Sequence, residues 1–159
     1  MISASRVAVL AAVGFLAACG GGSDTPTAPA RPTLQLREIV ITDSASRVLS
    51  FSHRDHWHGF PVVPMSSGLN VRVFYSTDQR DPDDHDMPAR TSWITMDTLS
   101  AEYNVRTVIS DTTVARFSGD RRGGLFTGMR ANSASVVSFV VRRGTATLFE
   151  APPLNFTVR

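Results

Sequence analysis

The stretch Val71-Arg72-Val73-Phe74-Tyr75 places apolar side chains at every second position, and this spacing decides the fold. Successive side chains of a β-strand point to opposite faces, so a period of two is typical of a strand with one buried face. Further runs of this kind occur at 34–41, 49–53, 105–109, 137–141 and 154–158. The sequence therefore predicts a fold built from short strands.

Clusters of Gly, Pro, Asn and Asp separate these runs at 64–68, 78–88, 119–124 and 144. Such residues are typical of turns between strands. No segment has a convincing helical period, and 97–103 is the nearest helical candidate. About seven or eight short strands in one domain predict an all-β fold, a single antiparallel β-sandwich.

The C-terminal part of the chain, from GLFTG at 124–128 to PLNFTV at 153–158, resembles the final strands of bacterial Ig-like modules in its spacing. The resemblance implies an Ig-like sandwich over residues 34–159. The disulfide and the core tryptophan of those modules have no counterpart here.

The N-terminus has the features of an export signal. Arg6 precedes an apolar run over 7–17, which is too short for a stable membrane span. The sequence Leu16-Ala17-Ala18-Cys19 then resembles the bacterial lipobox. This resemblance implies that 1–18 is a signal peptide with a helical apolar part, and that Cys19 is acylated after cleavage. An ordinary secretory signal with a chance cysteine is the alternative.

Residues 19–33 comprise Cys19 and a Gly/Ser/Pro/Thr-rich stretch that predicts a flexible linker. Two or three acyl chains would hold the protein on a membrane. The expected location is therefore the bacterial cell envelope, and Gly20 favours the outer membrane. Because Cys19 is the only cysteine, the domain must fold without disulfides.

The charge of the chain gives no sign of nucleic-acid binding. All 16 basic residues are arginines, against 14 acidic residues. Loss of Arg6 with the signal would leave a net charge of about +1. The arginines are dispersed along the chain and form no basic run that would predict a nucleic-acid interface.

The four histidines are the strongest functional signal. Three lie in HRDHWH, residues 53–58, and the fourth lies in the acidic run DQRDPDDHD, residues 78–86. Neutral imidazole is the commonest side-chain metal ligand, and three or four imidazoles suit Zn²⁺ or Cu²⁺. The sequence predicts one transition-metal site, zinc or copper, with the ligands His53, His56, His58 and His85.

Acidic residues could support this site. Asp55, Asp84 and Asp86 are candidates for an extra ligand or for a carboxylate that orients a histidine ring. Trp57 alternates with His56 and His58 and is predicted to belong to the core. The plainer interpretation is a solvated polar edge with a soluble acidic loop. The acidic run lacks the ligand spacing of an EF-hand.

Whether the two stretches meet depends on strand pairing. If 56–63 is one strand that turns at 64–68, His56 and His58 lie opposite 74–76, and the acidic loop begins nearby. If the strand ends at His58 and turns at once, His85 is carried about 25 Å away at about 3.3 Å per residue. We favour the first arrangement, because Phe60, Val62 and Val63 need a strand that buries them.

The favoured function is a lipid-anchored extracytoplasmic protein that captures, buffers or delivers a transition metal, with a metal transporter or receptor as its partner. A structural or adhesive Ig-like module without metal is one alternative. The pattern His85-x-Met87, with Met65 and His53 upstream, also resembles the ligand pattern of periplasmic copper(I) chaperones.

No motif predicts an enzyme. The chain lacks His-Glu-x-x-His and Gly-x-Ser-x-Gly, and its three glutamates, Glu38, Glu102 and Glu150, are distant in sequence from the histidines. A metal-dependent hydrolase or oxidase is kept only as a minor alternative, with Asp55 as its candidate base.

Overall fold

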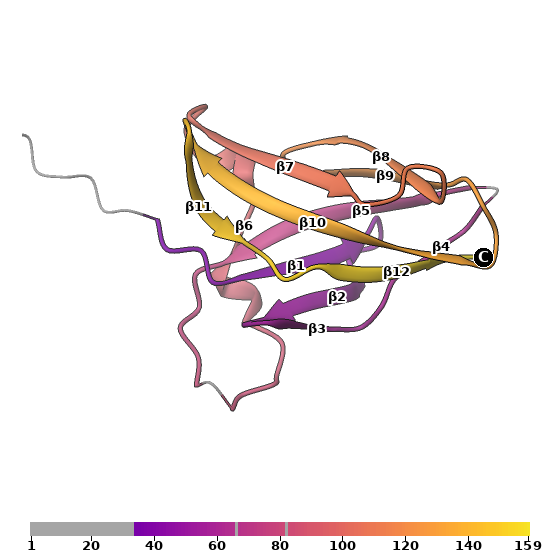
Figure 1. Cartoon of the computed structure of the whole chain (residues 1–159). Coiled ribbons are helices and arrows are strands. Elements are labelled where there is room, and N and C mark those ends of the chain that lie inside the picture. Colours follow the sequence, from indigo (N-terminus) through magenta and orange to yellow (C-terminus); the bar gives the residue numbers. More distant parts are fainter. Residues whose placement is uncertain (1–33, 66, 82) are drawn as a thin grey trace, which may run out of the picture. The chain divides into compact units, whose positions relative to one another are not determined.

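Alternating side chains build two β-sheets in the computed structural model, which describes residues 34–65, 67–81 and 83–159 (Figure 1). The first sheet has seven strands in the order β3-β2-β1-β5-β9-β8, with β6 paired to β5. Its strands are β1 (Glu38–Asp43), β2 (Val48–His53), β3 (His56–His58), β5 (Leu69–Ser76), β6 (Trp93–Ile94), β8 (Ala115–Asp120) and β9 (Gly123–Gly128).

The second sheet has five strands in the order β11-β10-β12-β4, with β7 paired to β10. Its strands are β4 (Val62–Val63), β7 (Tyr103–Ile109), β10 (Ser133–Arg143), β11 (Ala146–Glu150) and β12 (Leu154–Val158). All pairings in both sheets are antiparallel except β12 with β4, which is parallel.

The prediction of an all-β sandwich is confirmed. The described residues contain twelve strands rather than seven or eight, because short strands such as β3, β4 and β6 escape a pattern search. The nearest helical candidate, 97–103, forms no α-helix, as the lack of a convincing helical period predicted; it overlaps the 3₁₀ turn η2 (Met96–Thr98) and reaches the start of β7, and a second such turn is η1 (Arg90–Ser92).

The Ig-like strand topology stays a prediction. The predicted signal peptide, Cys19 and the linker as far as residue 33 lie outside the described residues. Within the described part of the chain, no helix is long and apolar enough to cross a membrane.

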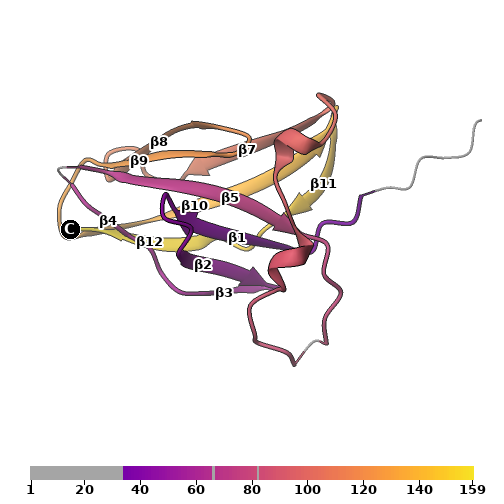
Figure 2. The same cartoon turned by 180° about the vertical axis from the view of Figure 1, so that it is seen from behind.

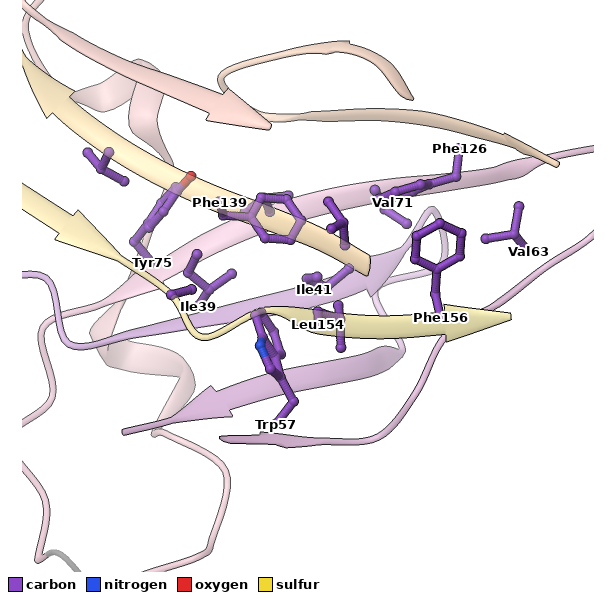
Figure 3. Close-up of a cluster of buried hydrophobic side chains, with 14 of the residues drawn as sticks. Ile39, Ile41, Trp57, Val63, Val71, Tyr75, Phe126, Phe139, Leu154 and Phe156 are labelled. Atoms are coloured by element: carbon purple, nitrogen blue, oxygen red, sulfur yellow. The ribbon is translucent and has the colours of Figure 1, made fainter. Parts of the chain in front are cut away.

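The core lies between the two sheets. Ile39, Ile41 and Tyr75 of the first sheet, together with Phe139 and Phe156 of the second, are almost completely buried (Figure 3). Burial of such side chains contributes about 1.5–3 kcal/mol each to folding. This apolar layer explains why the strands alternate as they do.

Trp57 is the anchor of β3 in this core. It is 7% exposed, its ring centroid lies 6.2 Å from that of Phe139, and its indole nitrogen donates to the Pro152 carbonyl at 2.6 Å. Figure 3 shows the side chain reaching from β3 toward Leu154. The prediction that Trp57 is a core residue is confirmed, and its burial turns His56 and His58 to the opposite face.

The favoured strand register was wrong. β3 ends at His58 and pairs with β2, while Val62–Val63 forms β4 in the other sheet. The chain leaves β3 at Gly59, whose φ of 80° favours glycine. A Cβ at Gly59 would lie 2.5 Å from the Leu49 carbonyl oxygen, so the close approach also requires glycine.

For a strand that ends at His58, a separation of about 25 Å between His85 and the other histidines was expected. This separation does not occur, because β1 lies between β2 and β5. Ser76, the last residue of β5, pairs with Glu38, the first residue of β1. The acidic loop (77–89) therefore starts at the sheet end where β2 turns into β3, and both views show it beside that turn (Figures 1 and 2).

Candidate metal centre

The outer face of the β2–β3 hairpin carries three histidines. His53 pairs with His56 across the strands, and Phe51 pairs with His58, so these four side chains share the face opposite Trp57. A two-residue turn joins the strands, with Arg54 in the left-handed region at φ 50°. Cross-strand neighbours lie about 4.5–5.5 Å apart at Cβ, which is within reach of shared ligand binding.

The acidic loop brings the fourth histidine to this face. His56 Nε2 lies 3.2 Å from His58 Nε2, and His85 Nδ1 lies 3.4 Å from the same His58 atom. Ligand nitrogens of these three histidines all lie within 4.8 Å of one another. Nitrogens about 2.0–2.1 Å from a tetrahedral Zn²⁺ are about 3.3 Å apart, so the cluster has the spacing of a metal site.

His53 lies beside this group. Its ring centroid is 5.7 Å from that of His56, 6.4 Å from that of His58 and 5.4 Å from that of His85. The structure thus brings His56, His58 and His85 within ligand distance of one another at the surface, and it places His53, buried at 3% exposure, beside them but outside that group.

Carboxylates contact two of the rings. His53 Nδ1 lies 2.9 Å from Glu38 Oε1, and His56 Nδ1 lies 3.0 Å from Asp55 Oδ1. An ionised carboxylate only accepts hydrogen bonds, so Asp55 favours a neutral His56 with the proton on Nδ1 and the lone pair on Nε2. His53 Nδ1 also lies 3.2 Å from Arg80 Nη2, which is a donor, so these contacts are compatible with either tautomer of His53. This carboxylate–histidine arrangement is typical of metal ligands.

The surroundings of His58 favour its neutral form. Burial, followed by the nearby His56, His85 and His53 rings, lowers the pKa of His58 below its usual value of 6.5. A hydrogen bond from His56 lowers the pKa of Asp55, so this carboxylate stays ionised near neutral pH. Neutral imidazole is the form that binds a metal ion.

Phe51 holds the ring of His58. The two rings stack with centroids 4.6 Å apart and an interplanar angle of 15°. The His56 side chain is 42% exposed, so the cluster is open to solvent on one side. An ion can therefore reach the site without opening the core.

The three predicted acidic residues make different contacts. Asp55 bonds His56 and is 92% exposed, which suits an orienting role. Asp84 Oδ1 accepts the Asp86 backbone N–H at 2.9 Å and pairs with Arg80 at 3.4 Å. Asp86 accepts a bond from Arg80 through its backbone carbonyl. Asp84 and Asp86 thus build the loop, as the plainer interpretation of the acidic run held.

The copper(I) ligand set is not brought together. The Met65 backbone N–H donates to the Arg159 carbonyl at 2.8 Å, which places Met65 beside the C-terminal residue. Figure 1 shows the C-terminus at the far end of the strands from the acidic loop. Met87 is 39% exposed on that loop. The four imidazoles meet without Met65.

Sequence reasoning missed two residues of the site, Glu38 and Arg80. Glu38 was set aside because it is distant in sequence, yet β1 pairs with β2 and its carboxylate is buried against His53. Arg80 Nη2 donates to Glu38 Oε1 at 2.6 Å. The only available signal was an acidic residue inside the apolar stretch 36–41, since a buried charge needs a partner.

Comparison with known proteins adds no assignment: no family model, no curated protein and no solved structure matches the chain.

Proposed function

We propose that this protein is a lipid-anchored extracytoplasmic metal-binding protein that captures Zn²⁺ with His53, His56, His58 and His85. The anchor is inferred from the lipobox-like Leu16–Cys19 sequence. The observation that carries the proposal is the mutual spacing of the four rings. Histidines from two separate segments share one small volume on the outer face of the sheet.

The spacing fits four imidazoles around one tetrahedral ion. A ring centroid lies about 3.2 Å from a zinc ion that its nitrogen binds, so four tetrahedral ligands have centroids about 5.2 Å apart. The six distances among the four rings are 4.9, 5.3, 5.4, 5.4, 5.7 and 6.4 Å. Five of the six lie within about half an ångström of the tetrahedral value.

A square-planar site fits less well. Four imidazoles around Cu²⁺ or Ni²⁺ in a plane would have two opposite pairs about 6.4 Å apart and four adjacent pairs about 4.5 Å apart. His53 and His58 are 6.4 Å apart, but the complementary pair, His56 and His85, is only 5.3 Å apart. The geometry therefore favours Zn²⁺ over Cu²⁺.

The donor set favours binding over catalysis. A catalytic zinc has three protein ligands and an open position for water, whereas sites that hold zinc are closed by four. The ligand nitrogens of His56, His58 and His85 lie within 4.8 Å of one another, and the proposal adds His53, whose ring centroid is 5.4–6.4 Å from theirs, as the fourth ligand. We therefore propose capture, buffering or delivery of the ion, with a metal transporter or receptor as the recipient.

The test is zinc binding by the untagged protein. Isothermal titration with ZnCl₂ is expected to give one site per chain, and elemental analysis is expected to find about one zinc per chain. His56→Ala combined with His58→Ala removes two ligands and is expected to weaken binding at least about a hundredfold. Binding is also expected to raise the melting temperature, because the ion binds only the folded state.

Asp83→Ala is the matched control. Asp83 is an exposed acidic residue on the same loop, so its loss tests unspecific attraction by carboxylates. This variant is expected to bind as the wild type does. Equal zinc affinity of the wild type and the double histidine variant would reject the proposal and leave a structural or adhesive module.

A further inference from the structure

Arg80 connects the acidic loop to the sheet. Its side chain is 9% exposed, although arginine is rarely buried without a role in pairing charges. Nη2 donates to Glu38 Oε1 on β1 at 2.6 Å. Nη1 pairs with Asp84 Oδ1 at 3.4 Å and also donates to the Asp86 carbonyl oxygen. One guanidinium thus bridges β1 and the loop.

The loop contacts of Arg80 flank His85. Asp84 and Asp86 are the residues directly before and after it, so Arg80 holds the segment that presents this imidazole. With these contacts made, His85 Nδ1 lies 3.4 Å from His58 Nε2. In this conformation the loop therefore supplies the ring of His85 to the cluster.

On the sheet, Arg80 contacts the carboxylate that lies against His53. Glu38 Oε1 accepts from Arg80 Nη2 at 2.6 Å and lies 2.9 Å from His53 Nδ1, and Arg80 Nη2 is itself 3.2 Å from His53 Nδ1. The Glu38 side chain is only 6% exposed, and a buried carboxylate requires a compensating charge. Arg80 supplies that charge, so it also supports the carboxylate that orients His53.

We propose that Arg80 is a positioning residue that couples closure of the acidic loop to assembly of the histidine site. The inference rests on the proposed zinc binding. Closure brings His85 to the ring cluster and neutralises Glu38 in the same step. Linkage is reciprocal, so zinc stabilises the closed loop by the same factor by which closure raises zinc affinity.

The test is Arg80→Met, a variant of similar side-chain length without charge, measured by zinc titration in the untagged full chain. Electrostatics alone predicts stronger binding, because the variant removes a positive charge near a cation. The coupling predicts the opposite, a tenfold to hundredfold loss, as is typical when residues that orient metal ligands are replaced. Unchanged or stronger binding would overturn the inference.

Arg72→Met is the control. The Arg72 guanidinium lies 5.3 Å from the Phe74 ring centroid on β5 and makes no described contact with the histidines or with the loop. The Arg72→Met variant also loses one positive charge from this sheet, and its zinc affinity is expected to stay within about twofold of the wild type. A loss equal to that of Arg80→Met would count against a specific role for Arg80.

Two further readouts separate positioning from folding. Bound Co²⁺ absorbs strongly in a tetrahedral site, and the absorption is expected to weaken in Arg80→Met as His85 leaves the ligand set. Hydrogen exchange at 83–89 is expected to slow on zinc addition in the wild type and to slow less in the variant. The same exchange rates with and without zinc in the wild type would refute the coupling.

Asp84→Asn is the second variant, for the case that Arg80→Met does not fold. The amide oxygen keeps an acceptor for the Asp86 N–H, while the charge that pairs with Arg80 is lost. We expect a threefold to tenfold loss of zinc affinity, and no loss would contradict the inference. If the wild type binds no zinc, the proposed function is rejected. If the wild type binds zinc and the variants bind it equally well, only the coupling is rejected.

Discussion

The two faces of the β2–β3 hairpin differ completely although their residues alternate along the same strand. Trp57 faces inward, where it packs with Phe139 between the sheets. His56 and His58 face outward, where they meet His53 and His85. The inner face contributes to the core, whereas the outer face carries the histidine cluster. Because the core holds the strand backbone, we expect replacement of the surface residues His56 and His58 to leave the fold intact.

The inner face is expected to give the largest effect. Trp57→Ala leaves a cavity and removes a hydrogen bond to Pro152, and such a change costs about 3–5 kcal/mol of unfolding free energy. Chemical denaturation measures this loss, which should be the same in the presence of a zinc chelator. A loss seen only with zinc bound would mean that the two faces are not separable.

Zinc binding at the outer face is expected to weaken at low pH. Histidine has an ordinary pKa of about 6.5, and each ligand must be neutral, so zinc affinity should fall at least about a hundredfold from pH 7.5 to pH 5.5. Titration calorimetry at the two pH values checks this. Affinity that is constant over this range would exclude an all-imidazole site.

His58 also makes the stability of the metal-free protein depend on pH. The pKa of His58 is lowered in the folded state, so protonation favours unfolding. The stability that neutral His58 contributes is present above the ordinary value of about 6.5 and is lost as the pH falls toward the lowered value.

Asp55→Asn tests the exposed part of the site. The amide keeps an acceptor for His56 Nδ1–H but carries no charge. We therefore expect zinc affinity to fall by only about threefold to tenfold. Replacement of residues that orient metal ligands typically lowers affinity by about tenfold to a hundredfold, so this loss is at or below the smallest usual effect. Denaturation of the metal-free variant should match the wild type. A hundredfold loss would indicate that Asp55 itself binds the ion.

Arg54→Gly is expected to give the smallest effect. Arg54 has φ 50° in the turn that sets His53 against His56, and glycine relieves this strain. We expect a gain of about 1 kcal/mol in stability with zinc affinity within a few-fold of the wild type. Thermal denaturation with matched zinc titrations checks both, and destabilisation would show that the arginine side chain itself supports the turn.

Local patterns were sufficient for part of the structure. The alternation in 71–75 and 137–141 predicted strands that form β5 and the middle of β10. The alternation around Trp57 predicted that it is buried with His56 and His58 on the other face. These predictions succeeded because side-chain direction in a strand follows from the backbone alone.

Strand pairing was not accessible in the same way. The favoured register set His56 and His58 against 74–76, whereas their partners are His53 and Phe51. The pattern of β3 is compatible with either neighbour, since both pairings bury Trp57. Gly59 was the residue that marked the end of the strand, and its role depends on the nearby Leu49 carbonyl of another strand.

The sequence by itself determined a β-sandwich, four histidines in two segments and the buried side of β3, because these depend on residue type and on the two-residue period of a strand. Only the tertiary structure decided that the segments meet, and that Glu38 and Arg80 support them. The physical reason is that β1 separates β2 from β5 and begins, at Glu38, beside the acidic loop. Such contacts join residues distant in sequence, and no local pattern specifies them.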